Sequence, residues 1–137
     1  MGAHRAEGWA RRLAFLVFAL LLLYVALAWD QHGISNDEEV QHVYGRLLVD
    51  FYTSGFADRA AFTYKNLYLY GGFFDLIAAG LERLVPGVLV WDMRHLLSAG
   101  FGLLGLAAVW QLGRELGGEA WKERTGLAAL VLLALTG

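Results

Sequence analysis

The residues best suited to chemistry begin with two adjacent carboxylates, Asp37 and Glu38, at the start of a predicted helix. A carboxylate at such a position can act as a general base or hold a divalent cation. The run of acids that continues to Glu39 also fits the first helical turn after Ser35, because a capping box and the helix dipole both favour negative charge there. The acid pair is therefore compatible with catalysis, with metal binding and with a purely structural role.

Three further side chains are candidates for the same site. His42 follows the acid pair on or near the same helical face and is a third candidate metal ligand, although an exposed histidine on a polar face is the commoner finding. Lys65 and Arg94 are lone cations near the predicted membrane surface, where they either anchor the chain or pair with a lipid phosphate. The candidate catalytic residues are Asp37 and Glu38, the candidate substrate-binding residues are Lys65 and Arg94, and the candidate metal ligands are Asp37, Glu38 and His42.

The elements that must position these residues are hydrophobic helices. Of the 137 residues, 58% are hydrophobic and 18% are charged, whereas soluble domains are typically about half apolar. Residues 10–29 and 94–113 are each long and apolar enough to cross a bilayer, and residues 125–137 resemble the start of a third span. A cleaved signal peptide is the alternative for the first segment, because Ala26-Leu27-Ala28 fits a cleavage site. We therefore expect an all-α, polytopic membrane protein, of which this chain is an amino-terminal fragment.

Two amphipathic juxtamembrane helices are predicted between the first two spans, over residues 36–54 and 66–85. The first places its apolar side chains at helical spacing on one face: Val40, Val43, Tyr44, Leu47, Leu48 and Phe51. Residues 67–81 of the second are apolar apart from Asp75, whose burial at mid-membrane would be costly, and Glu82 and Arg83 follow. We therefore expect residues 66–85 to lie on the outer leaflet rather than to cross it.

Basic residues give the predicted orientation. They gather in the first 12 residues, at the start of the first span, and in the predicted turn over residues 114–124: Arg5, Arg11, Arg12, Arg114, Lys122 and Arg124. Because such clusters remain on the cytoplasmic side, the amino terminus and this turn are predicted to be cytoplasmic and residues 30–94 to lie outside. The expected location is the plasma (inner) membrane, with the candidate site in an extracytoplasmic loop.

Composition also excludes several classes of function. The net charge of −2 and the absence of long runs of like charge leave no electrostatic footprint for nucleic acid, so we expect no nucleic-acid partner. The chain has no cysteine, which excludes a disulfide framework and thiolate metal sites.

The order of these parts resembles the amino-terminal portion of membrane glycosyltransferases with the GT-C fold, which include protein mannosyltransferases and the aminoarabinose transferases of lipid A. The likeness covers residues 10–137. Asp37-Glu38 is similar to the acidic motif of the family's first outer loop, and Tyr64-Lys65-Asn66-Leu67-Tyr68 stands where the family often has a Lys-Pro-Pro-Leu-Tyr-like stretch, here without the prolines. Residues 92–99 (DMRHLLSA) and 111–116 (QLGREL) resemble the start and the cytoplasmic end of the next span.

The resemblance implies transfer of a sugar from a polyprenyl-phosphate carrier to an acceptor on the outer face of the membrane. Asp37 would act as base or position a metal, Glu38 would assist it, and Lys65 would offset charge on the departing lipid phosphate. The implied partners are the lipid bilayer and the polyprenyl-phosphate-linked sugar donor, and a divalent cation is the one cofactor under consideration. The competing class is a non-enzymatic membrane scaffold or transporter subunit, in which residues 37–39 only cap a helix.

Overall fold

The computed structural model describes residues 2–31, 33 and 35–136, and within these ranges the chain is all-helical, with no strand. The predicted all-α fold is confirmed. The side chain of Arg5, used in the predicted orientation, and Gly137, the last residue of the predicted third span, lie outside the described part. The chain forms two compact units, one made of residues 1–28 with 98–137 and the other of residues 29–97.

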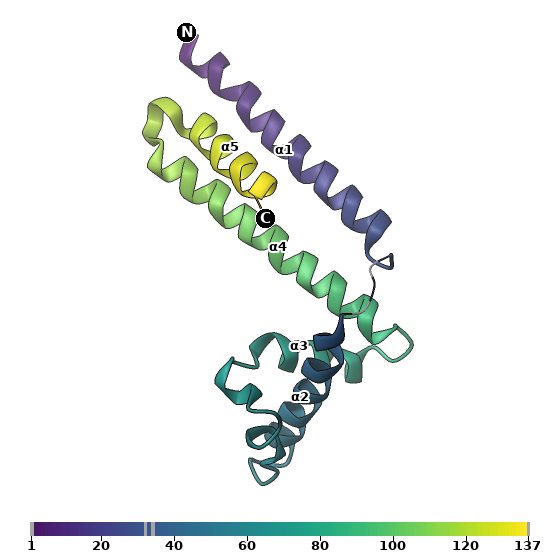
Figure 1. Ribbon diagram of the computed structural model, residues 1–137. Helices are drawn as coiled ribbons and strands as arrows, with labels where there is room; N and C mark the ends of the chain where they lie inside the picture. The colour runs from purple at the N-terminus through teal and green to yellow at the C-terminus, as the bar shows by residue number, and fades with distance from the viewer. Residues whose placement is uncertain (1, 32, 34, 137) are drawn as a thin grey trace. The chain divides into compact units, whose positions relative to one another are not determined.

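The first unit contains α1 (Gly2–Ala28), the part of α4 (Val90–Leu116) from Ser98 onward, and α5 (Gly118–Thr136). Figure 1 shows α1 in purple beside α5 in yellow. Their shared core consists of small and branched side chains: Ala10, Ala14, Leu127 and Leu130. Alanine on one helix allows its backbone to come close to leucine side chains on the other, a usual way for apolar helices to pack.

Glycines set the close approach of α4 and α5. A methyl group at Gly113 would lie 2.9 Å from the Thr125 carbonyl oxygen, and one at Gly126 would lie 2.9 Å from the Trp110 carbonyl oxygen. The predicted turn over residues 114–124 is much shorter in the structure, because α4 continues to Leu116 and α5 begins at Gly118. The charged residues of this stretch are good helix formers and extend both helices instead of separating them.

Two helices are long and apolar enough to cross a membrane, α1 over Glu7–Ala28 and α4 over Val90–Leu116. The core helix of a soluble protein would be mostly buried, whereas only 11% and 6% of the most apolar stretch of these two helices is buried. Exposed leucines along α1, such as Leu16, Leu20 and Leu23, suit a lipid surface better than water. The two helices suggest that the protein associates with a membrane.

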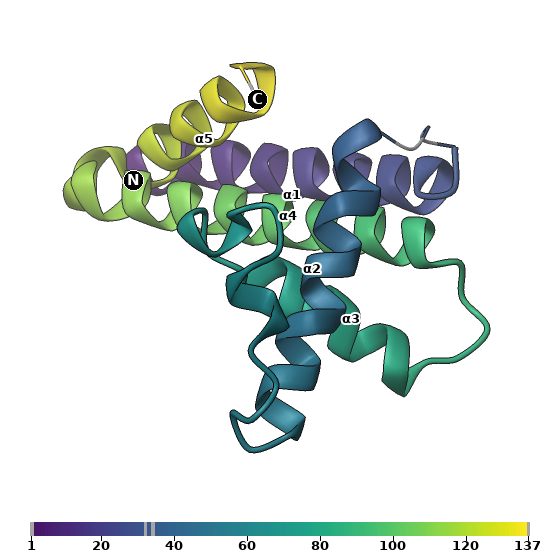
Figure 2. The same ribbon diagram turned by 60° about the horizontal axis from the view of Figure 1, so that its bottom comes forward.

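The second unit contains α2 (Asn36–Thr53), η1 (Ala60–Phe62), η2 (Leu67–Leu69), α3 (Phe73–Leu84) and residues 90–97 of α4. Figure 2 shows α2 beside α3, and these two helices form the main packing contact of the unit. Tyr44 and Leu48 on α2 pack with Ala61 of η1 to form its buried core. The predicted apolar face of residues 36–54 therefore serves as the packing face of α2.

The predicted helix over residues 66–85 is interrupted in the structure. Only η2 and α3 are helical, and the chain between them turns at Gly71, whose φ is +81°. Asn66, immediately before η2, also has a left-handed φ of +58°. Left-handed residues cannot continue a right-handed helix, so the α-helix starts at Phe73 rather than at residue 66.

Candidate functional site

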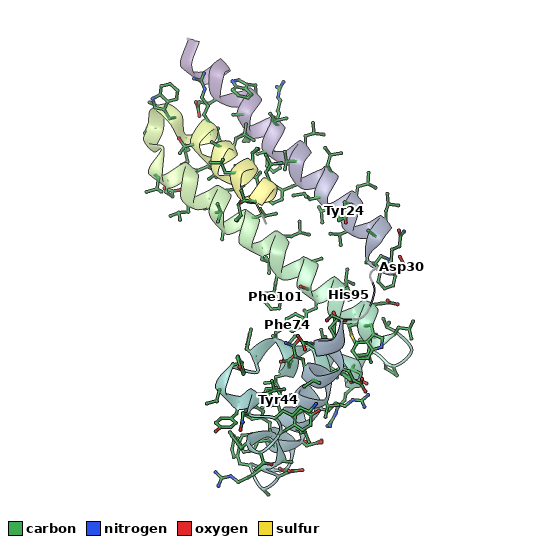
Figure 3. The ribbon with its side chains drawn as sticks, viewed as in Figure 1. Tyr24, Asp30, Tyr44, Phe74, His95 and Phe101 are labelled. Atoms are coloured by element: carbon green, nitrogen blue, oxygen red, sulfur yellow. The ribbon has the colours of Figure 1, made fainter. Side chains whose placement is uncertain are left out.

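A pocket of about 650 Å³ opens in the second unit. Its volume falls within the range of roughly 300–1,000 Å³ that is usual for small-molecule sites. Aromatic and aliphatic residues form most of its wall, and four side chains that are charged or carry an amide, Asp37, Gln41, Lys65 and Asp75, add polar groups. The other lining residues are Val40, Tyr44, Leu67, Tyr70, Gly71 and Phe74. Figure 3 labels Tyr44 on α2 and Phe74 on α3, which come to this pocket from the two packed helices. Ligand sites usually combine apolar walls with a few convergent polar groups, and this pocket contains both.

Asp37 and Lys65, two of the residues singled out from the sequence, line this same pocket. Asp37 is exposed, and within the described part of the chain its carboxylate takes part in no hydrogen bond or ion pair. The Lys65 ammonium lies 5.8 Å from the centre of the Tyr64 ring and has no carboxylate partner among the described residues. The pocket thus presents the Asp37 carboxylate and the Lys65 ammonium, together with the carboxylate of Asp75, to whatever enters it.

The loop before η2 determines where Lys65 lies. Both Lys65 and Asn66 have left-handed backbone angles, with φ of +47° and +58°. Asparagine tolerates this region well, but a lysine there is uncommon and costs conformational energy. Backbone hydrogen bonds on each side of the bend, from Leu67 N–H to the Tyr64 carbonyl and from Leu69 N–H to the Asn66 carbonyl, hold it in place. This bend brings Lys65 to the pocket.

Two glycines allow the elements around the pocket to come together. A methyl group at Gly45 of α2 would lie 2.3 Å from the backbone carbonyl oxygen of Asp75, so only glycine lets α3 cross α2 at this distance. A methyl group at Gly72 would lie 2.1 Å from a terminal carbon of Leu48. Position 45 therefore requires glycine for the observed packing, whereas a larger residue in place of Gly72 would displace the side chain of Leu48.

An ion pair that the sequence did not predict lies at the wall of the pocket. Arg94, in the first turns of α4, donates from Nη2 to Asp75 Oδ1 over 2.8 Å and to Gln41 Oε1 over 3.3 Å. Its guanidinium carbon lies 5.2 Å from the centre of the Phe74 ring. The Arg94 side chain is only 3% exposed and that of Asp75 12%. In the sequence, Asp75 and Arg94 are opposite charges in two apolar segments. Nothing in the sequence indicates that these segments contact each other.

Arg94 consequently differs from its predicted role as a phosphate-binding or surface-anchoring cation. Arg94 is buried and does not line the pocket. It contacts two residues that do, Asp75 and Phe74. Arg94 positions Asp75 instead of facing a ligand.

Tyr44 contributes a buried hydroxyl to the same pocket. Burial of the phenol, together with the negative charge of Asp75, raises the pKa of Tyr44 above its usual value of 10. The hydroxyl therefore keeps its proton at neutral pH and remains able to donate a hydrogen bond.

Glu38 does not line the pocket. Its Oε2 accepts a hydrogen bond of 3.0 Å from the Ser35 backbone N–H, which is the capping contact expected at the start of α2. Its Oε1 lies 3.1 Å from Nε2 of His95 on α4. Both carboxylate oxygens of Glu38 thus contact other parts of the unit, whereas Asp37 lines the pocket.

His42 is buried, at 7% exposure, and not on an exposed polar face as expected. Its Nε2 lies 3.5 Å from Glu82 Oε2 on α3. The centres of the His42 and Trp91 rings are 5.5 Å apart, and the two rings are arranged edge to face. Burial lowers the pKa of His42 below 6.5, and the charge of Glu82 opposes that shift only in part. Glu82 also accepts from Arg46, and this hydrogen bond lowers the pKa of Glu82.

The three predicted metal ligands do not converge. Asp37 lines the pocket, Glu38 contacts His95, and His42 faces Glu82. Across residues 2–31, 33 and 35–136, no group of three or more His, Asp or Glu side chains is arranged to hold a metal ion. The residues present do not fit a divalent cation, and we derive no chemical step through one.

Comparison with known proteins gives no match: no protein-family model, no curated protein and no solved structure matches this chain.

Proposed function

We propose that this chain is the amino-terminal part of a polytopic membrane glycosyltransferase with the GT-C fold. The protein would transfer a sugar from a polyprenyl-phosphate carrier to an acceptor on the outer face of the plasma (inner) membrane. The observation that carries the proposal is that Asp37 and Lys65 line one pocket in the stretch of chain that connects two helices capable of crossing a membrane. The basic residues in the first 12 positions of the chain and around the α4–α5 turn favour a cytoplasmic amino terminus and an outer location for that stretch.

The reaction assigns a distinct task to each of the two charged side chains. The Asp37 carboxylate takes the proton of the acceptor hydroxyl while the oxygen of that hydroxyl forms a bond to the anomeric carbon of the sugar. The bond between that carbon and the phosphate oxygen breaks, and its electron pair stays on the phosphate. Lys65 stabilises the negative charge of the departing polyprenyl phosphate, an effect that is strong where water is excluded.

Replacing Lys65 with Gln in the full-length protein should lower the rate of sugar transfer by roughly 100-fold, because losing one charge-stabilising donor typically costs that much. Lys65→Arg should retain much of the activity, since the positive charge remains. The measurement is transfer from a polyprenyl-phosphate sugar in membranes that contain the variant.

The matched control is Arg59→Gln, which removes an exposed cation that precedes η1 and does not line the pocket. Transfer by this variant should remain near the wild-type rate. Equal activity of Lys65→Gln and Arg59→Gln would remove Lys65 from the mechanism.

A scaffold without catalytic activity is the second candidate, and one observation favours it. Glu38 caps α2 and contacts His95, so part of the acidic run has a complete structural explanation. Under this alternative, Asp37 would need no pocket and no nearby cation. A full-length protein that transfers no sugar from any polyprenyl-phosphate donor would support the scaffold.

A further inference from the structure

We propose that Asp75, held by Arg94, accepts hydrogen bonds from the hydroxyl groups of the donor sugar and so forms the sugar-recognising wall of the pocket. This inference rests on the proposed function and adds to it a second carboxylate whose task is recognition, not proton transfer. Asp75 lines the pocket together with Asp37 and Lys65.

The carboxylate of Asp75 retains capacity for a ligand. Its Oδ1 accepts the hydrogen bond of 2.8 Å from Arg94. An ionised carboxylate has about four acceptor positions on its two oxygens, so this bond occupies only part of them. The Asp75 side chain is 12% exposed, and Asp75 is one of the residues that line the pocket. A hydroxyl group entering the pocket would meet an acceptor that is already oriented.

Arg94 makes that orientation rigid. Its side chain is buried, stacks over the ring of Phe74 and bridges Asp75 to Gln41 of α2. The glycine crossing at Gly45 fixes the backbone of Asp75 from the other side. A carboxylate held from two sides presents its acceptor oxygens with little loss of conformational entropy when a ligand binds.

Charge decides which part of the donor faces Asp75. The donor has an anionic phosphate and an uncharged or amino-bearing sugar. A carboxylate repels phosphate, whereas the Lys65 ammonium attracts it. The phosphate therefore lies toward Lys65 and the sugar toward Asp75, with Gln41 and the protonated hydroxyl of Tyr44 as further hydrogen-bonding groups beside it. The rings of Tyr70 and Phe74 complete an aromatic wall.

The test compares two ligands on the full-length protein: bare undecaprenyl phosphate, and undecaprenyl phosphate carrying mannose or 4-aminoarabinose. Binding is measured without acceptor, so that no transfer is required. Wild type should bind at least one sugar-loaded carrier more tightly than the bare carrier. Asp75→Asn should reduce that preference by roughly 10- to 100-fold, as expected for lost hydrogen bonds to a charged group, and leave the affinity for the bare carrier nearly unchanged.

Two further variants keep the result interpretable. Asp75→Asn leaves the buried Arg94 without its ion-pair partner, which could by itself alter the pocket. The double variant Asp75→Asn with Arg94→Gln removes both charges and should show the same loss of preference for the sugar-loaded carrier. Asp50→Asn removes a carboxylate that pairs with Arg83 outside the pocket, and should leave the preference unchanged.

The outcomes separate the inference from the proposed function. If wild type binds both carriers equally, or if both Asp75 variants keep the wild-type preference, the inference is overturned while Lys65-dependent binding of the carrier can still support the proposed function. If wild type binds neither carrier, both are overturned. A misfolded variant would lose affinity for both ligands together, so only a change in their ratio supports the inference.

Discussion

Asp37→Asn in the full-length protein should lower kcat for sugar transfer by roughly 10²- to 10⁴-fold, the usual contribution of a general base. The amide keeps the size of the side chain but cannot accept the proton from the acceptor hydroxyl. Donor affinity should change little, because the proposed mechanism assigns the phosphate to Lys65 and the sugar to Asp75. The measurement is a kinetic comparison with wild type at saturating donor, with binding of the donor measured separately.

Glu39→Gln is the matched control for this variant. Glu39 is an exposed acid on the same first turn of α2 and does not line the pocket. Its substitution should leave kcat close to wild type, and Glu38→Gln should act mainly through stability because Glu38 serves as a cap. If kcat falls equally in the Asp37 and Glu39 variants, or in neither, Asp37 is not the base.

Arg94→Ala should reduce the local stability of the second unit by about 3–5 kcal/mol, because removing one partner of a buried ion pair leaves an uncompensated charge. In this case the stranded group is Asp75, whose side chain is only 12% exposed. Native-state hydrogen exchange of the backbone amides of α2 and α3 measures this effect directly, since these helices are tied together through Arg94.

The control for Arg94 is Arg83→Ala, which breaks the ion pair between Arg83 and Asp50. Those side chains are 46% and 44% exposed, and exposed pairs contribute only about 0–1 kcal/mol. Exchange in α2 and α3 should therefore change little. Similar exchange rates in the Arg83 and Arg94 variants would show that the buried pair does not hold the two helices together.

The helices themselves were largely predictable, because they depend on local patterns. The apolar stripe and the capping residues placed α2 within a residue of its observed limits, Asn36–Thr53. The long apolar runs likewise predicted α1 and α4, although both extend beyond the predicted spans. The start of α3 was missed because it depends on the backbone angle at Gly71, which the apolar composition of the stretch does not reveal.

The candidate site was predictable only in part, because its contacts join distant parts of the chain. Asp37 and Lys65 were singled out as residue types suited to the chemistry, and the pocket that they share depends on how the loop before η2 bends. The pairing of Asp75 with Arg94 requires the close helix crossing at Gly45, which has no local signature. Burial of His42 was missed for the same reason.

His42 shows why a polar face on a helical wheel does not guarantee exposure. Its neighbours Glu82 and Trp91 come from α3 and α4, and together they cover a position that α2 alone would leave in solvent. A glutamate partner makes such burial tolerable for a histidine.

In the proposed mechanism, Asp37 and Lys65 act on one sugar phosphate in one pocket. The most direct test is a cryo-EM structure of the full-length protein with a non-cleavable phosphonate analogue of a polyprenyl-phosphate sugar. The account predicts the phosphonate within hydrogen-bonding distance of Lys65 Nζ, the sugar against Asp75, and the anomeric carbon facing Asp37. An analogue bound at a site that none of these three residues touches would contradict it.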